Sequence, residues 1–244
     1  MQRGQCHSPT SAWLVSTPSE EGPMTTANTS SLPVKVAQLS LLVILDRSGS
    51  MESIARDMEG GVNAFVAGLR DDRELDAKVT LAQFDDHYEL LYSDEPIASL
   101  PACQIAPRGM TALWDAVGRT VSTARARIGA LQPDAKPDRV VVLVVTDGAE
   151  NASQEWTGAA VSQLVDETKA EGWEYVFLAA NVDAFAEGQR MGLHRHETID
   201  YAPYREDVQE VMAYSSDKVA RLAKGEAASG LPTREEWRRE RRRP

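Results

Sequence analysis

Cysteine is nearly absent from this chain of 244 residues, which contains only Cys6 and Cys103. Cys6 lies in an N-terminal stretch rich in Ser, Thr and Pro, and Cys103 lies in a predicted loop. Two cysteines placed in this way do not suggest a disulfide framework. A reducing compartment fits the shortage best, and we expect the protein to be cytoplasmic.

Long hydrophobic runs are also missing. The longest, residues 41–45 and 140–145, are far shorter than the roughly 20 residues that a membrane-spanning helix needs. The apolar stretch at residues 12–15 is too short for the hydrophobic region of a signal peptide. We therefore expect neither membrane insertion nor secretion.

Several sequence motifs of enzymes are lacking too. The chain has no P-loop, no Gly-x-Ser-x-Gly motif and no telling Cys/His pair, so we expect a protein that is not an enzyme. The formal net charge of −11 argues against general nucleic-acid binding, because phosphate groups would be repelled. Positive charge gathers at residues 234–243, REEWRRERRR, which could contact an acidic partner or RNA. A solvated, frayed helix end is the simpler interpretation of that run.

The hydrophobic content of 42% is that of a globular protein, and the length favours one domain with tails. Residues 1–33 have too few apolar side chains to offset their ordering entropy, so we expect a disordered tail, and translation could start at Met24. We expect a domain at 34–224 and an Arg-rich tail at 225–244.

Strand-like and helix-like patterns alternate within the domain. Apolar runs predict buried strands that end near residues 45, 146 and 180, and two short strands flank a hairpin turn at 85–87. Helical periodicity covers residues 51–69, 112–131, 157–171 and 208–222. This alternation predicts an α/β fold, a Rossmann-like doubly wound and mostly parallel sheet with helices on both faces.

Oxygen-bearing side chains gather where the buried strands end. Asp46, Ser48 and Ser50 follow the first strand, where an extended turn would aim all three the same way, and Asp147 follows a later one. Thr111 lies in a Gly-containing loop before a helix. Ligands of such sheets bind beyond the carboxyl ends of the strands. Two carboxylates and three hydroxyls, without His or Cys, suit Mg²⁺ or Mn²⁺.

Three segments resemble the signature loops of von Willebrand factor A domains that carry a metal-ion-dependent adhesion site. They are DRSGSM at 46–51, GMTALWDA at 109–116 and TDGAEN at 146–151. The resemblance covers about residues 35–224, and standalone proteins of this kind occur in bacteria and their phages. It implies a sheet of about six strands with one antiparallel edge strand.

The resemblance also implies roles for the residues. Asp46, Ser48 and Ser50 would ligate the metal, Thr111 would bind it directly or through water, and Asp147 would bind it mostly through water. An Asp or Glu from a partner protein would complete the site. The resemblance thus implies a protein-binding module that depends on Mg²⁺ or Mn²⁺.

Other interpretations remain open. Asp46, Ser48 and Ser50 could be turn or helix-cap residues without a metal. The protein could also be a Mg²⁺-dependent phosphatase or hydrolase, or a structural subunit of a larger ATPase- or chelatase-like complex. Arg47, beside the site, should point away from its neighbours.

Further polar residues are candidates for the second shell or the rim of the site: Asp115, Glu150, Asn151, Asn181 and Asp183. Asp115 is expected to accept hydrogen bonds near the site. Glu150 and Asn151 suit a turn, and Asp183 suits a helix N-cap. Trp114 and Trp156 could frame the site, although packed indoles are the simpler interpretation.

Overall fold

The structure is a computed structural model that describes residues 36–181 and 183–241. The expected N-terminal tail at 1–33, the alternative start at Met24 and the last three residues lie outside the described part of the chain. Within that part, no helix is both long and apolar enough to cross a lipid bilayer.

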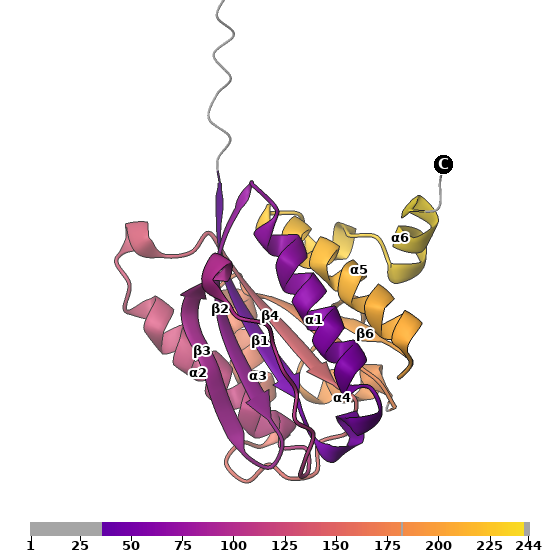
Figure 1. Ribbon diagram of the computed structural model, residues 1–244. Coiled ribbons are helices and arrows are strands. Elements are labelled where there is room, and N and C mark those ends of the chain that lie inside the picture. The colour runs from indigo at the N-terminus through magenta and orange to yellow at the C-terminus, as the bar shows by residue number, and fades with distance from the viewer. Residues whose placement is uncertain (1–35, 182, 242–244) are drawn as a thin grey trace, which may run out of the picture. The chain divides into compact units, whose positions relative to one another are not determined.

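A six-stranded sheet with the order β3-β2-β1-β4-β5-β6 forms the centre of the domain (Figure 1). Edge strand β3 is antiparallel to β2, and the other neighbours are parallel. The prediction of a mostly parallel α/β sheet with one antiparallel edge strand is therefore confirmed. The strands are β1 (Ala37–Asp46), β2 (Leu75–Phe84), β3 (Tyr88–Pro96), β4 (Arg139–Thr146), β5 (Glu174–Ala179) and β6 (Thr198–Asp200).

The central strands are apolar throughout because both of their faces are covered. In β1, Leu41 and Val43 pack into one hydrophobic cluster, whereas Leu42 and Ile44 pack into the cluster on the other face. Alternate residues of a strand point to opposite faces, so a strand buried on both sides needs an unbroken apolar run. β4 repeats this pattern, which explains the run at 140–145.

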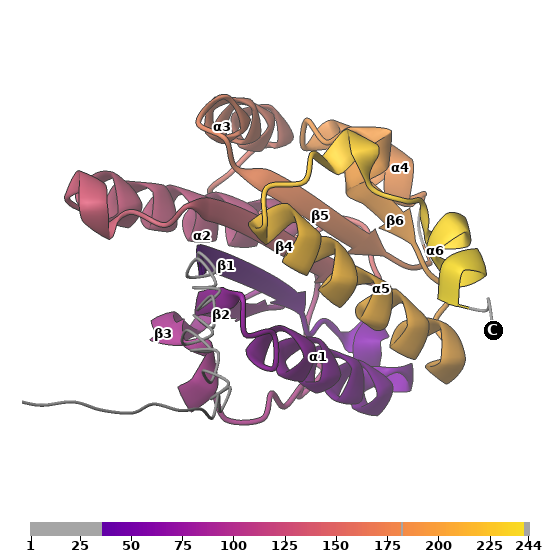
Figure 2. The ribbon, with the colours of Figure 1, turned by 90° about the horizontal axis from the view of Figure 1, so that it is seen from above.

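Helices cover the two faces of the sheet as separate layers. Figure 2 shows α1 and α5 on one face and α2, α3 and α4 on the other. The helical patterns predicted at 51–69, 112–131, 157–171 and 208–222 correspond to α1, α2, α3 and α5. The helices are α1 (Ala55–Arg70), α2 (Leu113–Gly129), α3 (Gly158–Ala170), α4 (Ala184–Arg190), α5 (Arg205–Ala223) and α6 (Arg234–Arg241).

The C-terminal segment differs from the solvated, frayed helix end that was the simpler interpretation of residues 234–243. Its helix α6 packs against α5, and Trp237 is buried in the same cluster as Tyr214. The segment has the charged composition of a solvent-exposed helix. It is nevertheless held against α5 by one buried indole and by two arginines that form ion pairs with acids of α5. The packed body thus extends through Arg241.

The strand order reverses at β1, because the chain proceeds from β1 to β2 on one side and later returns to β4 on the other. Such a reversal leaves a crevice beyond the carboxyl ends of the two strands. Asp46 ends β1 and Thr146 ends β4, so the expected ligands lie at this crevice.

Candidate metal centre

The first loop of the candidate site begins where β1 ends. Asp46 is fully buried, and its Oδ1 accepts a hydrogen bond of 2.6 Å from the Ser48 backbone N–H. The Oγ atoms of Ser48 and Ser50 lie 3.0 Å apart, so the two hydroxyls do point toward one another. The loop is not the extended turn that the sequence suggested, because a 3-10 helix begins at Gly49 (Gly49–Ser53) and already contains Ser50.

The second loop follows β4 and meets the first. Ser50 Oγ donates to Asp147 Oδ1 at 2.6 Å, and Thr146 Oγ1 donates to Asp46 Oδ2 at 2.5 Å. These two hydrogen bonds join loops about a hundred residues apart in the sequence. Asp147 is 1% exposed, and its other oxygen, Oδ2, is buried without a hydrogen-bond partner among the described residues.

The third loop brings Thr111 to the same place. A Cβ atom added to Gly148 would lie 3.2 Å from Thr111 Oγ1 and 3.5 Å from Ser50 Oγ, so a glycine here leaves room between the hydroxyls. Asn151 holds Thr111 in position, because its Oδ1 accepts from the Thr111 N–H at 2.9 Å and its own N–H donates to the Thr111 carbonyl. The structure thus brings together all five predicted ligands.

Both carboxylates of this cluster are held in an environment that disfavours their charge. Burial raises the pKa of Asp46 to about 6, against hydrogen bonds from Thr146 and Ser48 that lower it, and the nearby Asp147 raises it further. Burial also raises the pKa of Asp147. No ion pair between described residues involves either carboxylate. Keeping two buried carboxylates ionised costs free energy, unless a bound cation compensates their charge.

Helix capping does not account for the serines. Neither the 3-10 helix nor α1 receives a side-chain cap, and the hydroxyls of Ser48 and Ser50 instead contact one another and Asp147.

The candidate second-shell residues mostly support the loops. Asp115 accepts hydrogen bonds from the N–H groups of residues 154–156, and Glu150 accepts from the Trp114 N–H and from Ser153. These contacts fasten the loop after β4 to the start of α2. Asp115, Glu150 and Asn151 therefore act on the candidate site through the backbone that carries Thr111 and Asp147.

The remaining candidates lie outside this network. Asp183 is the N-cap of α4 and accepts from the Ala186 N–H, as its simpler interpretation predicted. No hydrogen bond between described residues joins Asn181 or Asp183 to the five predicted ligands. Trp156 packs against Gly118 and Trp114 packs against Gly158, so both indoles contact helix glycines.

Sequence reasoning missed two supports of the site. Thr146 orients Asp46 by a hydrogen bond from its hydroxyl. In the sequence, this role is indicated only by the position of Thr146 between an apolar strand and Asp147. Asp85, in the hairpin turn, accepts hydrogen bonds from Arg47 at 3.0 Å and from Arg108 at 2.7 Å, and its backbone carbonyl accepts from the Ala112 N–H. Asp85 thereby ties the loop of Asp46 to the loop of Thr111. Arg47 points toward Asp85 and away from the predicted ligands, as the alternation of neighbouring side chains predicted.

Asp85, Asp86 and His87 also bring potential metal-ligating atoms within 4.8 Å of one another. Both oxygens of Asp85 already accept hydrogen bonds, one from the two arginines and the other from the His87 N–H. Although burial opposes the shift, the hydrogen bond from Arg108 and the two guanidinium charges help to hold the pKa of Asp85 below its usual range. Asp85 is thus a brace of the loops, and its charge is already balanced by two arginines.

The sheet order, the antiparallel edge strand and the flanking helices define a von Willebrand factor A-like α/β fold. No protein-family model matches the sequence, and no curated protein matches it. Solved structures do match the fold, at sequence identities too low to show more than the fold.

Three of these structures illustrate the likeness. Proximal thread matrix protein 1 from the mussel byssus matches with a TM-score of 0.53 and 14% identity, over 76% of this chain and 47% of that chain. Manganese-loaded Plasmodium vivax TRAP protein matches with a TM-score of 0.52 and 13% identity, over 75% of this chain and 74% of that one. A von Willebrand factor type A protein from Catenulispora acidiphila matches with a TM-score of 0.50 and 14% identity, over 75% and 42%. This chain thus spans about half the length of the mussel protein.

Proposed function

We propose that this protein is a cytoplasmic, divalent-metal-dependent protein-binding module of bacterial or phage origin. Asp46, Ser48, Ser50, Thr111 and Asp147 would hold Mg²⁺ or Mn²⁺, and the metal would capture an exposed Asp or Glu side chain of a partner protein. The fold supports the class of module, and the Plasmodium vivax protein of similar fold is manganese-loaded.

One observation carries the proposal. Asp147 Oδ2 is buried beside a cluster of three hydroxyls and has no hydrogen-bond donor among the described residues. A buried carboxylate oxygen without a donor is costly, and native proteins rarely keep one without a reason. A bound cation would supply the missing partner.

The chemistry of the donor set fits a small hard cation. All five side chains offer oxygen, and Mg²⁺ and Mn²⁺ prefer oxygen ligands over the nitrogen and sulfur that zinc and copper accept. The cation would offset the charge of two acids whose pKa values burial raises. Because Mg²⁺ takes about six ligands and usually keeps some water, a position remains for a carboxylate from outside.

Isothermal titration with MgCl₂ and with MnCl₂ tests the metal site. We expect one ion per wild-type chain, no measurable binding by Asp46→Ala and weaker binding by Ser48→Ala. Asp134→Ala, which removes an exposed acid outside the three loops of the candidate site, is the matched control and should bind as the wild type does. Absence of binding by the wild type, or equal binding by Asp46→Ala, would overturn the metal site.

The partner is tested separately by affinity capture from the native host in Mg²⁺ and in EDTA, with Ser48→Ala as the comparison. We expect a partner that is captured only by the wild type and only with metal. A set of captured proteins that does not change with metal would exclude the site as the interface. Release of phosphate from an aryl phosphate, abolished by Asp46→Asn, would instead indicate a hydrolase.

A further inference from the structure

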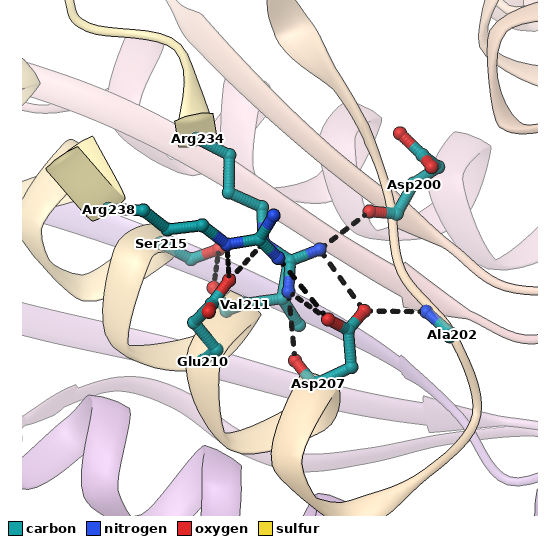
Figure 3. Close-up of polar contacts among 8 residues, drawn as sticks. All are labelled: Asp200, Ala202, Asp207, Glu210, Val211, Ser215, Arg234 and Arg238. Carbon is teal, nitrogen blue, oxygen red and sulfur yellow. Dashed lines mark hydrogen bonds and ion pairs between the residues drawn. The ribbon is translucent and has the colours of Figure 1, made fainter. Parts of the chain in front are cut away.

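The C-terminal segment forms a polar clamp on the loop between β6 and α5. Figure 3 shows Arg234 and Arg238, both from α6, directed at Asp207 and Glu210 in the first turns of α5. The Arg234 side chain is only 13% exposed, and Asp207 is 12% exposed, so this pair lies largely out of solvent.

Arg234 uses its whole guanidinium group in these contacts. It donates to Asp207 Oδ1 at 2.7 Å, to Glu210 Oε1 at 2.9 Å and to the Asp200 carbonyl of β6 at 3.0 Å. A planar fork with several fixed donors holds its partners in one geometry, which a single ammonium charge cannot do. Arg234 therefore fixes the end of β6 relative to the start of α5.

The same loop reaches the candidate metal site by a short chain of hydrogen bonds. Asp207 Oδ2, which also accepts from Arg234 at 3.2 Å, accepts from the Ala202 N–H at 2.7 Å (Figure 3). The preceding residue, Tyr201, is buried and donates from its hydroxyl to the Thr146 carbonyl at 3.1 Å. The Thr146 hydroxyl in turn donates to Asp46 Oδ2.

We propose that Arg234 is a positioning residue for the candidate metal site and acts on it through Asp207, Tyr201 and Thr146. This inference rests on the proposed metal binding. The guanidinium group fixes the loop between β6 and α5, and this loop positions the Tyr201 hydroxyl that donates to the Thr146 carbonyl. Thr146, at the end of β4, in turn orients Asp46 through its own hydroxyl. The C-terminal segment, whose sequence is that of a charged tail, then helps to position the residues of the candidate site.

The apolar contacts of α6 allow the clamp to be removed without losing the helix. Trp237 is 6% exposed and meets Tyr214 edge-on, with ring centroids 5.6 Å apart. Burial of an indole contributes a large share of the docking energy of so short a helix. Arg234→Met keeps an unbranched apolar stem and removes only the donors, so we expect that variant to stay folded.

The test compares Mn²⁺ affinity among variants of the full chain by isothermal titration. We expect Arg234→Met to bind Mn²⁺ about tenfold more weakly, and Tyr201→Phe, which lacks only the hydroxyl, to bind it similarly weakly. The double variant should lose little more, because contacts in one network are not additive. Arg125→Met is the matched control, since Arg125 makes a comparable fork with Glu167 and Glu171 on the opposite layer. It should bind Mn²⁺ as the wild type does.

A second readout needs no metal. In EDTA, the amide hydrogens of Ser48 and Gly148 report the orientation of Asp46 and Thr146, to which they donate. Arg234→Met and Tyr201→Phe should speed their exchange, whereas the Trp173 amide, bonded to Thr168 at the other end of the sheet, should be unchanged. Faster exchange everywhere would indicate general destabilisation and overturn the inference.

The two proposals fail in different ways. If the wild type binds no Mn²⁺, the proposed function fails, and the exchange data alone decide whether Arg234 positions the loops. If the wild type binds Mn²⁺ and both variants bind it equally well, with unchanged exchange at Ser48 and Gly148, Arg234 is not a positioning residue.

Discussion

Two neighbouring acids of the candidate site are held in different ways. Asp46 has protein donors on both carboxylate oxygens, whereas Asp147 has a donor on only one. Asp46 is therefore fixed in orientation by the protein itself, whereas one oxygen of Asp147 has no donor among the described residues. A fixed acid beside an available one is a suitable arrangement for binding a cation with little reorganisation.

The charge of Asp46 should make the metal-free protein less stable than it could be. Burial raises the pKa of Asp46 from 3.8 to about 6, so ionisation in the folded state costs about 3 kcal/mol. Asp46→Asn keeps the shape and removes the charge. We expect it to raise the free energy of unfolding by about 1–3 kcal/mol in EDTA at pH 7.5, measured by urea denaturation. The gain is smaller than the full cost of ionisation because the amide makes weaker hydrogen bonds than the carboxylate.

Asp134→Asn, at an exposed acid, should leave the free energy of unfolding unchanged. A metal-free Asp46→Asn protein less stable than the wild type would mean that the hydrogen bonds of the carboxylate outweigh its desolvation.

Lys218 should give the protein a distinctive alkaline response. Burial lowers the pKa of its ammonium group to about 8, against the opposing charges of Glu197 and Glu174. Between about pH 8 and 10.5 the unfolded chain keeps a proton that the folded chain has released, so this residue makes stability rise with pH by about 3 kcal/mol. Below pH 8 its contribution is constant.

Lys218→Met should abolish that rise, while Lys136→Met, at an exposed lysine, should retain it. Urea denaturation at pH 7.5, 8.5 and 9.5 measures the difference between the variants and the wild type. Parallel pH profiles for wild type and Lys218→Met would contradict the prediction.

At the scale of elements, apolar runs and helical periods predicted the sheet and its principal helices because each pattern is local. The two patterns fail where structure depends on distant contacts. The turn at Gly49, whose N–H donates to the Gly109 carbonyl, and the docking of α6 by Trp237 both involve neighbours remote in the sequence. Periodicity cannot register such neighbours.

The packing of α2 against the loop before α3 requires a glycine. A Cβ on Gly118 would lie 2.1 Å from Trp156 Cδ2, whereas a Cβ on Gly60 in α1 would meet nothing within 4 Å. We expect Gly118→Ala to lower the free energy of unfolding by about 1–3 kcal/mol through overpacking. Gly60→Ala should raise it by about 0.5–1 kcal/mol, since alanine loses less backbone entropy in a helix.

Both variants change a helical glycine to alanine, so each serves as the control for the other in urea denaturation. Equal effects of the two substitutions would show that the indole of Trp156 can move aside.

At the scale of the whole molecule, the candidate site depends on three loops that the sheet brings to one edge. The sequence predicted that five oxygen-bearing side chains would lie together, because each stands at the end of a recognisable strand or in a loop with a recognisable motif. It did not predict Thr146 or Asp85 as supports, nor Tyr201, for which we propose such a role, because a threonine, a turn acid and a buried tyrosine have no pattern of their own. Arg234 was not predicted either, because nothing in the charged run at residues 234–243 distinguishes it from the other arginines.

Metal binding should stabilise the whole domain. A ligand that binds only the folded state at 100 times its dissociation constant adds about 2.7 kcal/mol to the free energy of unfolding. We expect MgCl₂ to raise the melting temperature of the wild type in a concentration-dependent way, measured by calorimetry. NaCl at equal ionic strength controls for the screening of a chain whose net charge is −11.

Asp46→Ala should respond alike to the two salts. A wild type that also responds alike would mean that no specific ion is bound by the folded state.

The distance along the chain between the members of the site has a consequence for synthesis. Asp46 meets its hydroxyl donor Thr146 only after a hundred further residues have been made, and the clamp at Arg234 comes almost ninety later. Parallel strands pair slowly because long loops must close first. A ribosome-bound chain that stops before β4 thus lacks Thr146 and Asp147, so the cluster of five side chains cannot assemble until β4 and the loop after it have been made.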